Sequence, residues 1–433
     1  MNFKSIILLT FSGLLACNPE KITTQTDRDG VVTQLPFFWK SSISDGIRAE
    51  GLNHGYIINE NSILCVAMRK SSDPKKYGEY YLQLKDVNTG KNIWIWDDFY
   101  KKSIGSLRKS INLYPGKMLL HDGPYDYLIN TGSGTTIWKK ENKLYSASPY
   151  PAFLDDKFYF TANGINPSKE NKIQEGIYAG EVSTSNISEL VTPKYSEEYA
   201  VHKQGLPYYI GSLINIEAFK KDNINYLVVP HVEAGPIVKN SADRSFFGLF
   251  NLTQHKWMYE RVPLGFHEDG ASASVMPVVN SEKVYMTSLN SVSCFDVMSG
   301  KKNWEYRLSS DLVTPMDMLL VNNKLLVNCT NAKMYCFDAY TGNVLWEQQS
   351  SAIASDLYHQ DGVIYWIRTK NLLAVNIETG KVLWDLPSLD DKEENRPDSW
   401  HWGFVTGIPA KDGKKGKIFA TTNLNLYCFE AIK

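Results

Sequence analysis

One nine-residue pattern occurs five times in this chain and constrains its fold more than any other feature. Each copy reads Asp or Asn, two residues, Thr or Ser, Gly, three residues, Trp. The copies are DVNTGKNIW at 86–94, NTGSGTTIW at 130–138, DVMSGKKNW at 296–304, DAYTGNVLW at 338–346 and NIETGKVLW at 376–384. A chain of this length should contain on the order of 0.01 such matches by chance. Neighbouring copies place their Trp residues 44, 42 or 38 positions apart (138 − 94, 346 − 304, 384 − 346), which is a spacing typical of repeat arrays.

The residues around each copy predict four short antiparallel strands, here A to D. Before the third copy, KVYMTS and SVSCFD are β-branched and aromatic runs separated by turn residues, and similar runs precede the others. We expect the Gly to supply a positive φ in the C–D turn, and the Asp or Asn to bind turn amides. The Trp would lie on strand D and pack against the adjacent sheet. These structural residues are Gly90, Trp94, Gly134, Trp138, Gly300, Trp304, Gly342, Trp346, Gly380 and Trp384.

Four-stranded sheets of this kind cover one another when they repeat radially, which favours an all-β propeller. Two more units, near 181–190 and 250–259, have lost part of the motif, and Trp257 or Tyr259 would replace the Trp of the second. The chain ends in a unit without its strand D, and LPFFWKSS around Trp39 could supply it. We therefore predict an eight-bladed β-propeller of four-stranded antiparallel blades, closed by the N-terminal strand pairing into the C-terminal blade. Seven blades is the alternative.

The first residues are typical of an exported lipoprotein. Residues 1–16 combine Lys4 with an apolar run too short to span a bilayer, as in a cleaved signal peptide. Leu14-Leu15-Ala16-Cys17 resembles the bacterial lipobox, so Cys17 would become the lipidated first residue, although an ordinary signal peptide is the alternative. We expect residues 17–30 to be a flexible tether and 31–433 to be the propeller. The expected location is the bacterial envelope, at the outer membrane facing the periplasm, with surface exposure as the alternative.

Charge and cysteine usage narrow the function classes. The formal net charge of −1 argues against a nucleic-acid binder. Cys294, Cys336 and Cys428 share one repeat position that Ala374 takes in another unit, so the position suits a small buried side chain. We expect buried free thiols, with a disulfide between Cys329 and Cys336 as the alternative.

At KMYCFDAYTGNVLW and LLAVNIETGKVLW the chain resembles the PQQ-like β-propeller repeat family, strongly over 270–433 and 82–140 and weakly over 150–260. With the lipobox, it is most similar to the lipoprotein branch that serves outer-membrane assembly. That resemblance implies a non-catalytic scaffold that binds envelope proteins. The family's quinoprotein dehydrogenases would instead imply a quinone, a calcium ion with carboxylate and amide ligands, and a catalytic Asp.

This chain has no adjacent Cys pair, and no motif places those ligands. We therefore expect neither PQQ nor calcium, and we assign no catalytic, cofactor-binding or metal-binding residue. The alternative function is a ligand-handling propeller, either a divergent PQQ-dependent quinoprotein or a carbohydrate-active or carbohydrate-binding lipoprotein.

Long connections point to one face for a partner, because loops on a rigid scaffold are common binding sites. The B–C loops at 69–79, 163–176 and 232–245 and the D–A loops at 191–215 and 386–403 should share a face, opposite the Thr-Gly turns. Trp400, His401 and Trp402 are the candidate contacts, unless both Trp side chains pack against the next blade. We expect 267–269 and 390–394 to be solvated loops.

Overall fold

The computed structural model places most of the chain, and the descriptions below concern those residues alone. They are residues 22–44, 55–70, 78–100, 111–122, 125–141, 144–145, 151–165, 173–184, 186–192, 211–213, 215–233, 244–266, 275–309, 313–351, 355–368, 370–390, 402–422 and 424–432. The predicted signal peptide, Cys17, Trp400 and His401 therefore lie outside the described residues.

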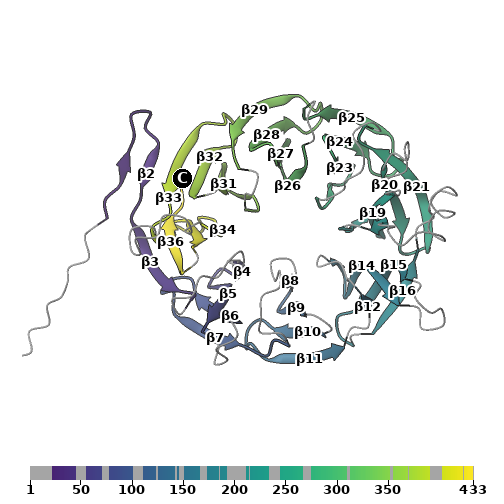
Figure 1. Cartoon of the computed structure of the whole chain (residues 1–433), viewed down its shortest axis with the longest axis horizontal. Helices are drawn as coiled ribbons and strands as arrows, with labels where there is room; N and C mark the ends of the chain where they lie inside the picture. Colours follow the sequence, from purple (N-terminus) through teal and green to yellow (C-terminus); the bar gives the residue numbers. More distant parts are fainter. Residues whose placement is uncertain are drawn as a thin grey trace, which may run out of the picture.

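Eight small antiparallel sheets stand in a ring around a central axis, so the prediction of an eight-bladed β-propeller is confirmed (Figure 1). We number the blades from the first sequence motif. Blade 1 consists of β4 (Gly55–Asn59), β5 (Ser62–Arg69), β6 (Glu79–Asp86) and β7 (Asn92–Trp96), and blade 2 of β8 (Ile111–Tyr114), β9 (Lys117–Asp122), β10 (Tyr125–Asn130) and β11 (Thr136–Glu141). Blade 3 consists of β12 (Leu144–Tyr145), β13 (Ala152–Leu154), β14 (Lys157–Ile165), β15 (Ile173–Glu181) and β16 (Ile187–Val191). Blade 4 consists of β17 (Gly211–Leu213), β18 (Glu217–Lys221), β19 (Ile224–Glu233), β20 (Arg244–Asn251) and β21 (Lys256–Leu264).

Blades 5 to 7 are complete within the C-terminal half, and blade 8 borrows one strand from the N-terminal end. Blade 5 consists of β22 (Val278–Val279), β23 (Lys283–Ser288), β24 (Ser291–Asp296) and β25 (Lys302–Arg307), and blade 6 of β26 (Pro315–Val321), β27 (Lys324–Cys329), β28 (Lys333–Asp338) and β29 (Val344–Gln349). Blade 7 consists of β30 (Tyr358–Gln360), β31 (Val363–Arg368), β32 (Asn371–Asn376) and β33 (Val382–Pro387). Blade 8 consists of β34 (Phe404–Ile408), β35 (Lys417–Thr421), β36 (Asn425–Glu430) and β3 (Phe37–Ser42).

The core lies between neighbouring blades. Strands B and C of each blade are covered on both faces, and for this reason β27 reads KLLVNC with all six residues buried. Strand D is covered on one face only, so β29 alternates between half-buried and exposed residues. Buried residues of adjacent blades form common clusters, such as Tyr285 of blade 5 with Leu325 of blade 6. Each blade therefore depends on its neighbours for burial of its apolar faces.

The turns and loops between strands lie on the two faces of the ring as predicted. The A–B and C–D turns meet on one face, where the amide of Thr131 donates to the carbonyl of Gly116. The B–C turns and the D–A connections meet on the other, where the amide of Asn290 donates to the carbonyl of Val313.

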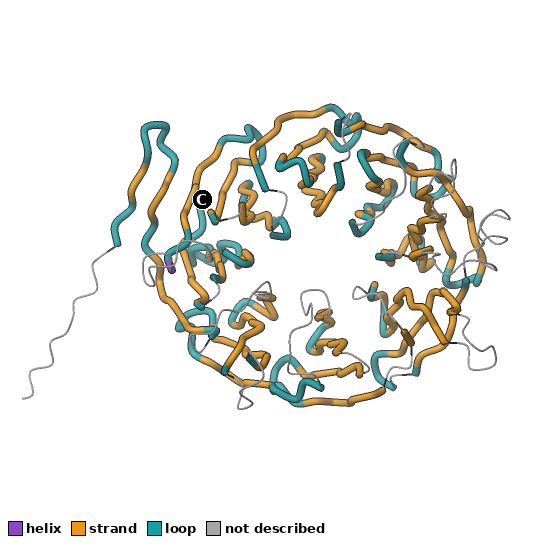
Figure 2. Tube along the Cα trace, in the orientation of Figure 1, coloured by secondary structure: helices purple, strands orange, loops and turns teal. Residues whose placement is uncertain are grey.

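The ring closes as predicted. Strand β3 pairs antiparallel with β36, and Trp39 lies opposite Cys428. The N-terminal segment also forms an unpredicted hairpin of β1 (Gln25–Thr26) and β2 (Val32–Gln34), and β2 contacts the edge of β33 in parallel through Val32 and Trp384. Figure 2 shows this hairpin beside the ring. Within the predicted tether of residues 17–30, Asp27 organises a turn by accepting from the amides of Asp29 and Val31.

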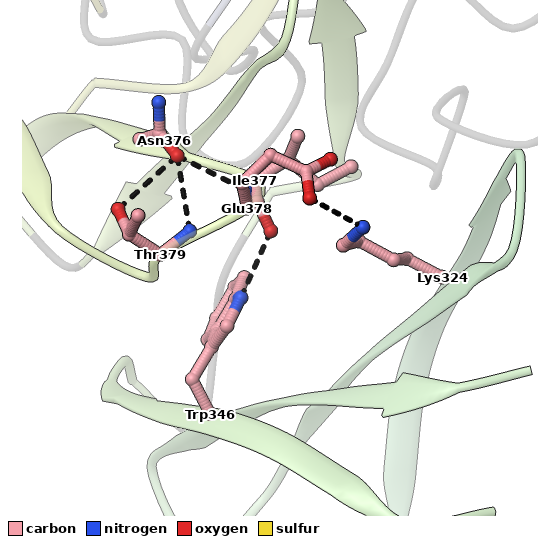
Figure 3. A network of polar contacts seen from close by, with 6 residues as sticks. All are labelled: Lys324, Trp346, Asn376, Ile377, Glu378 and Thr379. Carbon is pink, nitrogen blue, oxygen red and sulfur yellow. Dashed lines mark hydrogen bonds and ion pairs between the residues drawn. The ribbon is translucent and has the colours of Figure 1, made fainter.

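The Trp of the sequence motif joins several blades to the blade that follows. The indole nitrogen of Trp346 in blade 6 donates to the carbonyl of Ile377 in the turn of blade 7, at 2.9 Å (Figure 3). Asn376 shapes that turn by accepting hydrogen bonds from the amide and the hydroxyl of Thr379. An ion pair of 2.7 Å between Lys324 and Glu378 crosses the same boundary. The equivalent Trp-to-turn bonds join Trp39 to Val87, Trp94 to Thr131, Trp138 to Val182 and Trp304 to Ala339.

Blade 4 uses a tyrosine for this contact. The hydroxyl of Tyr259 donates to the carbonyl of Val297 at 2.8 Å, whereas Trp257 packs against Phe250 inside its own blade. Tyr259, not Trp257, therefore replaces the Trp. Gly342 shows why the turn needs glycine: its φ is +75°, and a Cβ would lie 2.6 Å from the ring of Trp304.

Candidate functional site: an axial cavity and a face of extended hairpins

A cavity of about 490 Å³ lies among the innermost strands. Six blades contribute to its wall, which combines apolar side chains with three carboxylates. Its lining residues are Tyr56, Ile111, Asn215, Glu217, Val275, Met276, Pro277, Val278, Val279, Met316, Asp317, Met318 and Asp356. The cavity is a candidate for binding a small ligand or one side chain of a partner.

The carboxylates give the cavity its chemistry. Burial raises the pKa of Glu217 to about 7, so this side chain titrates near neutral pH. Asp317 accepts one hydrogen bond from the amide of its neighbour Met318 and another from the amide of Leu357, and the second bond joins blade 6 to blade 7. None of the described residues that line the cavity is Lys, Arg or His. Such a wall favours neutral or positively charged groups over anions.

Within the described parts of the chain, no three His, Cys, Asp or Glu side chains lie close enough together to hold a metal ion. The cavity carboxylates therefore do not converge on one point. Sequence reasoning missed the cavity because its residues come from the first strands of six blades, which lack the repeat motif.

On the face of the B–C turns, three hairpins are longer than the rest. Strands β5 and β6 pair over eight residues as far as Arg69 and Glu79, and β14 and β15 pair over nine as far as Ile165 and Ile173. Strands β19 and β20 pair over eight, as far as Glu233 and Arg244. The corresponding hairpins of blades 5, 6 and 7 pair over six residues each.

Two of these long hairpins carry a third strand. Strand β12 pairs with the outer part of β14, and β17 pairs with the outer part of β19. Blades 3 and 4 thus continue as three-stranded sheets toward the hairpin tips. The tips themselves, at 71–77, 166–172 and 234–243, lie outside the described residues, as do 193–210 of one long D–A loop.

The described end of the other long D–A loop is buried. Trp402 is 2% exposed, donates from its indole nitrogen to the carbonyl of Leu386 and packs against Tyr427 and Phe429. Trp402 therefore fits the packing alternative and offers no surface to a partner. The expected solvated loop was also wrong at Asp390, which is fully buried and accepts hydrogen bonds from Asn425 and Tyr427.

The five described cysteines are free and buried, which confirms the expectation of unpaired thiols. Burial raises the pKa of the Cys65, Cys336 and Cys428 thiols to about 12, and it raises the pKa of Cys294 and Cys329 as well. These thiols are therefore unsuited to nucleophilic or redox chemistry at neutral pH.

Residues 254–433 match the family described as outer membrane protein assembly factor BamB. The BamB-like match covers blades 5 to 7, strands β34 to β36 of blade 8 and β21 of blade 4. No curated protein sequence matches the chain. Among the described residues, no helix is long and apolar enough to cross a membrane.

Solved structures share the propeller architecture at low sequence identity. Sqt1 of Saccharomyces cerevisiae aligns with a TM-score of 0.58 and 9% identity, covering 91% of this chain and 98% of that one. The quinohemoprotein alcohol dehydrogenase of Comamonas testosteroni gives 0.61 and 9%, covering 91% and 76%. BamB of Moraxella catarrhalis gives 0.43 and 15%, covering 83% and 92%. The first two likenesses describe the fold alone, and the third is too weak to add to them.

Proposed function

We propose that this chain is a non-catalytic scaffold of the bacterial envelope, lipid-anchored through Cys17 at the outer membrane and facing the periplasm. It binds an envelope protein through the face that carries the extended hairpins of blades 1, 3 and 4. The BamB-like match over residues 254–433 supports the envelope role, since that family is named for outer-membrane protein assembly.

The observation that carries the proposal is the unequal length of the B–C hairpins. Six paired residues suffice to build a blade, as β27 and β28 demonstrate. The additional residue pairs of β14–β15 and β19–β20 extend these two hairpins further, on one face of the disc. Paired strands hold their tips more rigidly than open loops do, which reduces the entropy lost when a partner binds.

The test is crosslinking in the native envelope, followed by capture of the chain and identification of its partner. In the test variant, Asn-Gly replaces residues 164–174 and closes the hairpin directly beyond the pair of Asn163 and Glu175. In the control variant, Asn-Gly replaces Asp412-Gly413, in an A–B turn on the opposite face. We expect the shortened hairpin to lose the crosslinked partner and the control to keep it. Equal capture by two variants that melt like the wild type would refute the assignment of this face.

Ligand handling is the second candidate function, and the axial cavity is the observation that favours it. A PQQ-type quinone carries three carboxylates, whereas the part of the cavity wall that the structure describes has Glu217, Asp317 and Asp356 and no cationic side chain. The residues present therefore do not fit such a quinone, and we propose no reaction step through it. A melting temperature that rises with added PQQ and calcium would contradict this conclusion and favour the enzyme.

A further inference from the structure

The outermost strand of most blades turns two side chains outward, one on each side of the motif Trp. The residue before the Trp is a β-bulge: Phe38 has no partner between the pairs of Phe37 with Phe429 and Trp39 with Cys428. The same bulge recurs at Ile93, Ile137, Asn303, Leu345 and Leu383. These positions can be compared around the rim because the register is the same in each blade.

Three consecutive blades carry an apolar rim. In blades 8, 1 and 2 the outward residues include Phe38, Ile93, Ile95 and Ile137, which are 53%, 51%, 53% and 46% exposed. Their strands β3, β7 and β11 follow one another around the ring (Figure 1). We call these four residues the apolar rim sector. Isolated exposed apolar residues are ordinary, but a run over adjacent elements marks an interaction surface.

Charge distinguishes this sector from the opposite rim. The residue after the Trp is Lys40 in blade 8, Ile95 in blade 1 and Lys139 in blade 2. In blades 5, 6 and 7 the equivalent residues are the carboxylates Glu305, Glu347 and Asp385. Each is ion-paired within its own blade, with Lys302, Lys333 and Arg368 respectively. The two carboxylates that follow β7 are ion-paired, Asp97 with Arg69 at 2.8 Å and Asp98 with Lys139 at 3.9 Å. The carboxylates of both arcs are thus ion-paired, and the sector differs in carrying Lys40 and Lys139 at the position where blades 5 to 7 carry a carboxylate.

The N-terminal hairpin determines how far the propeller can be from a lipid on Cys17. Gln25 pairs with Gln34, whose side-chain amide donates to the carbonyl of Thr23 at 3.2 Å. Thr23 is thereby held near the start of β3, because Gln34 precedes Phe37 by three residues. Six residues connect Cys17 to Thr23, which allows at most about 20 Å of extended chain. The anchor must therefore keep β3 close to the bilayer.

We propose that the apolar rim sector rests on the bilayer surface, with its side chains among the lipid headgroups and the rim of blades 5 to 7 turned away. Side chains of this kind bind the membrane interface weakly, and a nearby lipid anchor makes such binding persistent. Anionic lipids would add attraction to Lys40. This inference rests on the proposed lipidation of Cys17, and the experiments below separate the two.

The first experiment uses the lipidated protein on vesicles of phosphatidylethanolamine and phosphatidylglycerol. A lysine-acylating reagent is applied, and the rate at Lys40 is compared with that at Lys333, the first residue of strand C (β28) in blade 6. The unlipidated Cys17→Ala chain in solution gives the reference rates. We expect acylation of Lys40 to slow at least threefold on vesicles, and that of Lys333 to stay unchanged. If Lys40 is acylated at the same rate on vesicles as in solution, while the chain stays bound to the vesicles, the inference is overturned but the proposed lipidation of Cys17 is not. Protection that needs added envelope protein would also overturn it and assign the sector to a protein partner.

The second experiment does not depend on the lipid. Flotation with the same vesicles compares the Cys17→Ala chain with the same chain carrying Ile93→Asn, Ile95→Asn and Ile137→Asn. The matched control carries Met258→Asn and Leu345→Asn, which lie on rim strands of blades 4 and 6 and are 42% and 47% exposed. We expect the triple variant to lose about tenfold in partitioning and the control to lose little. Equal flotation of all three chains, with unchanged melting temperatures, would overturn the inference even if Cys17 proved unmodified.

Discussion

The indole nitrogen of Trp39 donates a hydrogen bond of 3.1 Å to the carbonyl of Val87, 48 residues later in the chain. Trp39 belongs to blade 8 and Val87 to the turn of blade 1, so this one contact crosses the closure of the ring. Ser41 reinforces it by donating to the carbonyl of Gly90 at 2.8 Å. The closure thus uses the same Trp-to-turn contact that Trp94, Trp138, Trp304 and Trp346 make between other blades.

Replacing Trp39 should therefore destabilise the whole propeller. We expect Trp39→Ala to reduce the free energy of unfolding by about 3 kcal/mol, since both packing and a hydrogen bond are lost. The adjacent Phe38→Ala is the control, because Phe38 is 53% exposed, and it should cost about 0.5 kcal/mol or less. Urea unfolding followed by tryptophan fluorescence measures both. Similar losses for the two variants would contradict the role of Trp39.

Replacing a turn glycine by alanine should destabilise the propeller for two separable reasons. Gly342→Ala adds a Cβ 2.6 Å from the ring of Trp304 at a φ of +75°, whereas Gly362 has a φ of +79° with no atom within 4 Å of such a Cβ. Both variants should carry the cost of a positive φ, about 1 kcal/mol. Gly342→Ala should lose a further 1–3 kcal/mol or so from overpacking. Equal melting temperatures for the two would show that the Trp304 ring moves aside freely.

The cavity residue Glu217 should make stability depend on pH. Its pKa is about 7 in the folded chain and near 4.5 when unfolded, so the folded state holds its proton more tightly. Stability from this group is therefore full below pH 4.5 and declines as the pH rises to about 7. We expect Glu217→Gln to raise the unfolding free energy by roughly 2 kcal/mol at pH 8 and by little at pH 4. Thermal melts of both proteins across this range provide the measurement, and a pH-independent difference would contradict the assignment.

The buried thiols should resist modification until the fold opens. We expect no appreciable reaction of Cys65, Cys294, Cys329, Cys336 or Cys428 with a disulfide-forming dye at pH 7.5, since each is buried and its pKa is raised. All five should react in guanidinium chloride, with or without prior reduction. Four or fewer reactive thiols without reduction would indicate a disulfide and contradict the free state.

Sequence reasoning predicted the ring well because the motif performs a local task. A turn of Asp338, Thr341 and Gly342 needs those residue types for its own hydrogen bonds and its positive φ, and this need is visible in the sequence. Where a tyrosine can supply the same donor, as Tyr259 does, the pattern is lost while the contact remains.

The features that could not be predicted from the sequence depend on contacts between distant segments. Trp402 and Asp390 lie in a polar, loop-like stretch, yet both are buried against blade 8. The β1–β2 hairpin has no apolar alternation to indicate it, and its position depends on β33. The cavity carboxylates come from strands with no shared pattern, so only the assembled ring brings them near one axis.

The closure of blade 8 has a consequence for how the chain is made. Strand β3 leaves the ribosome before any other strand of the eight blades, whereas its partner β36 leaves last. During synthesis Phe37–Ser42 therefore stays without its partner strand until the last blade has been made. An unpaired apolar strand is the kind of segment that aggregates or recruits a chaperone. The same pairing that seals the finished ring therefore makes its first strand the most vulnerable during biogenesis.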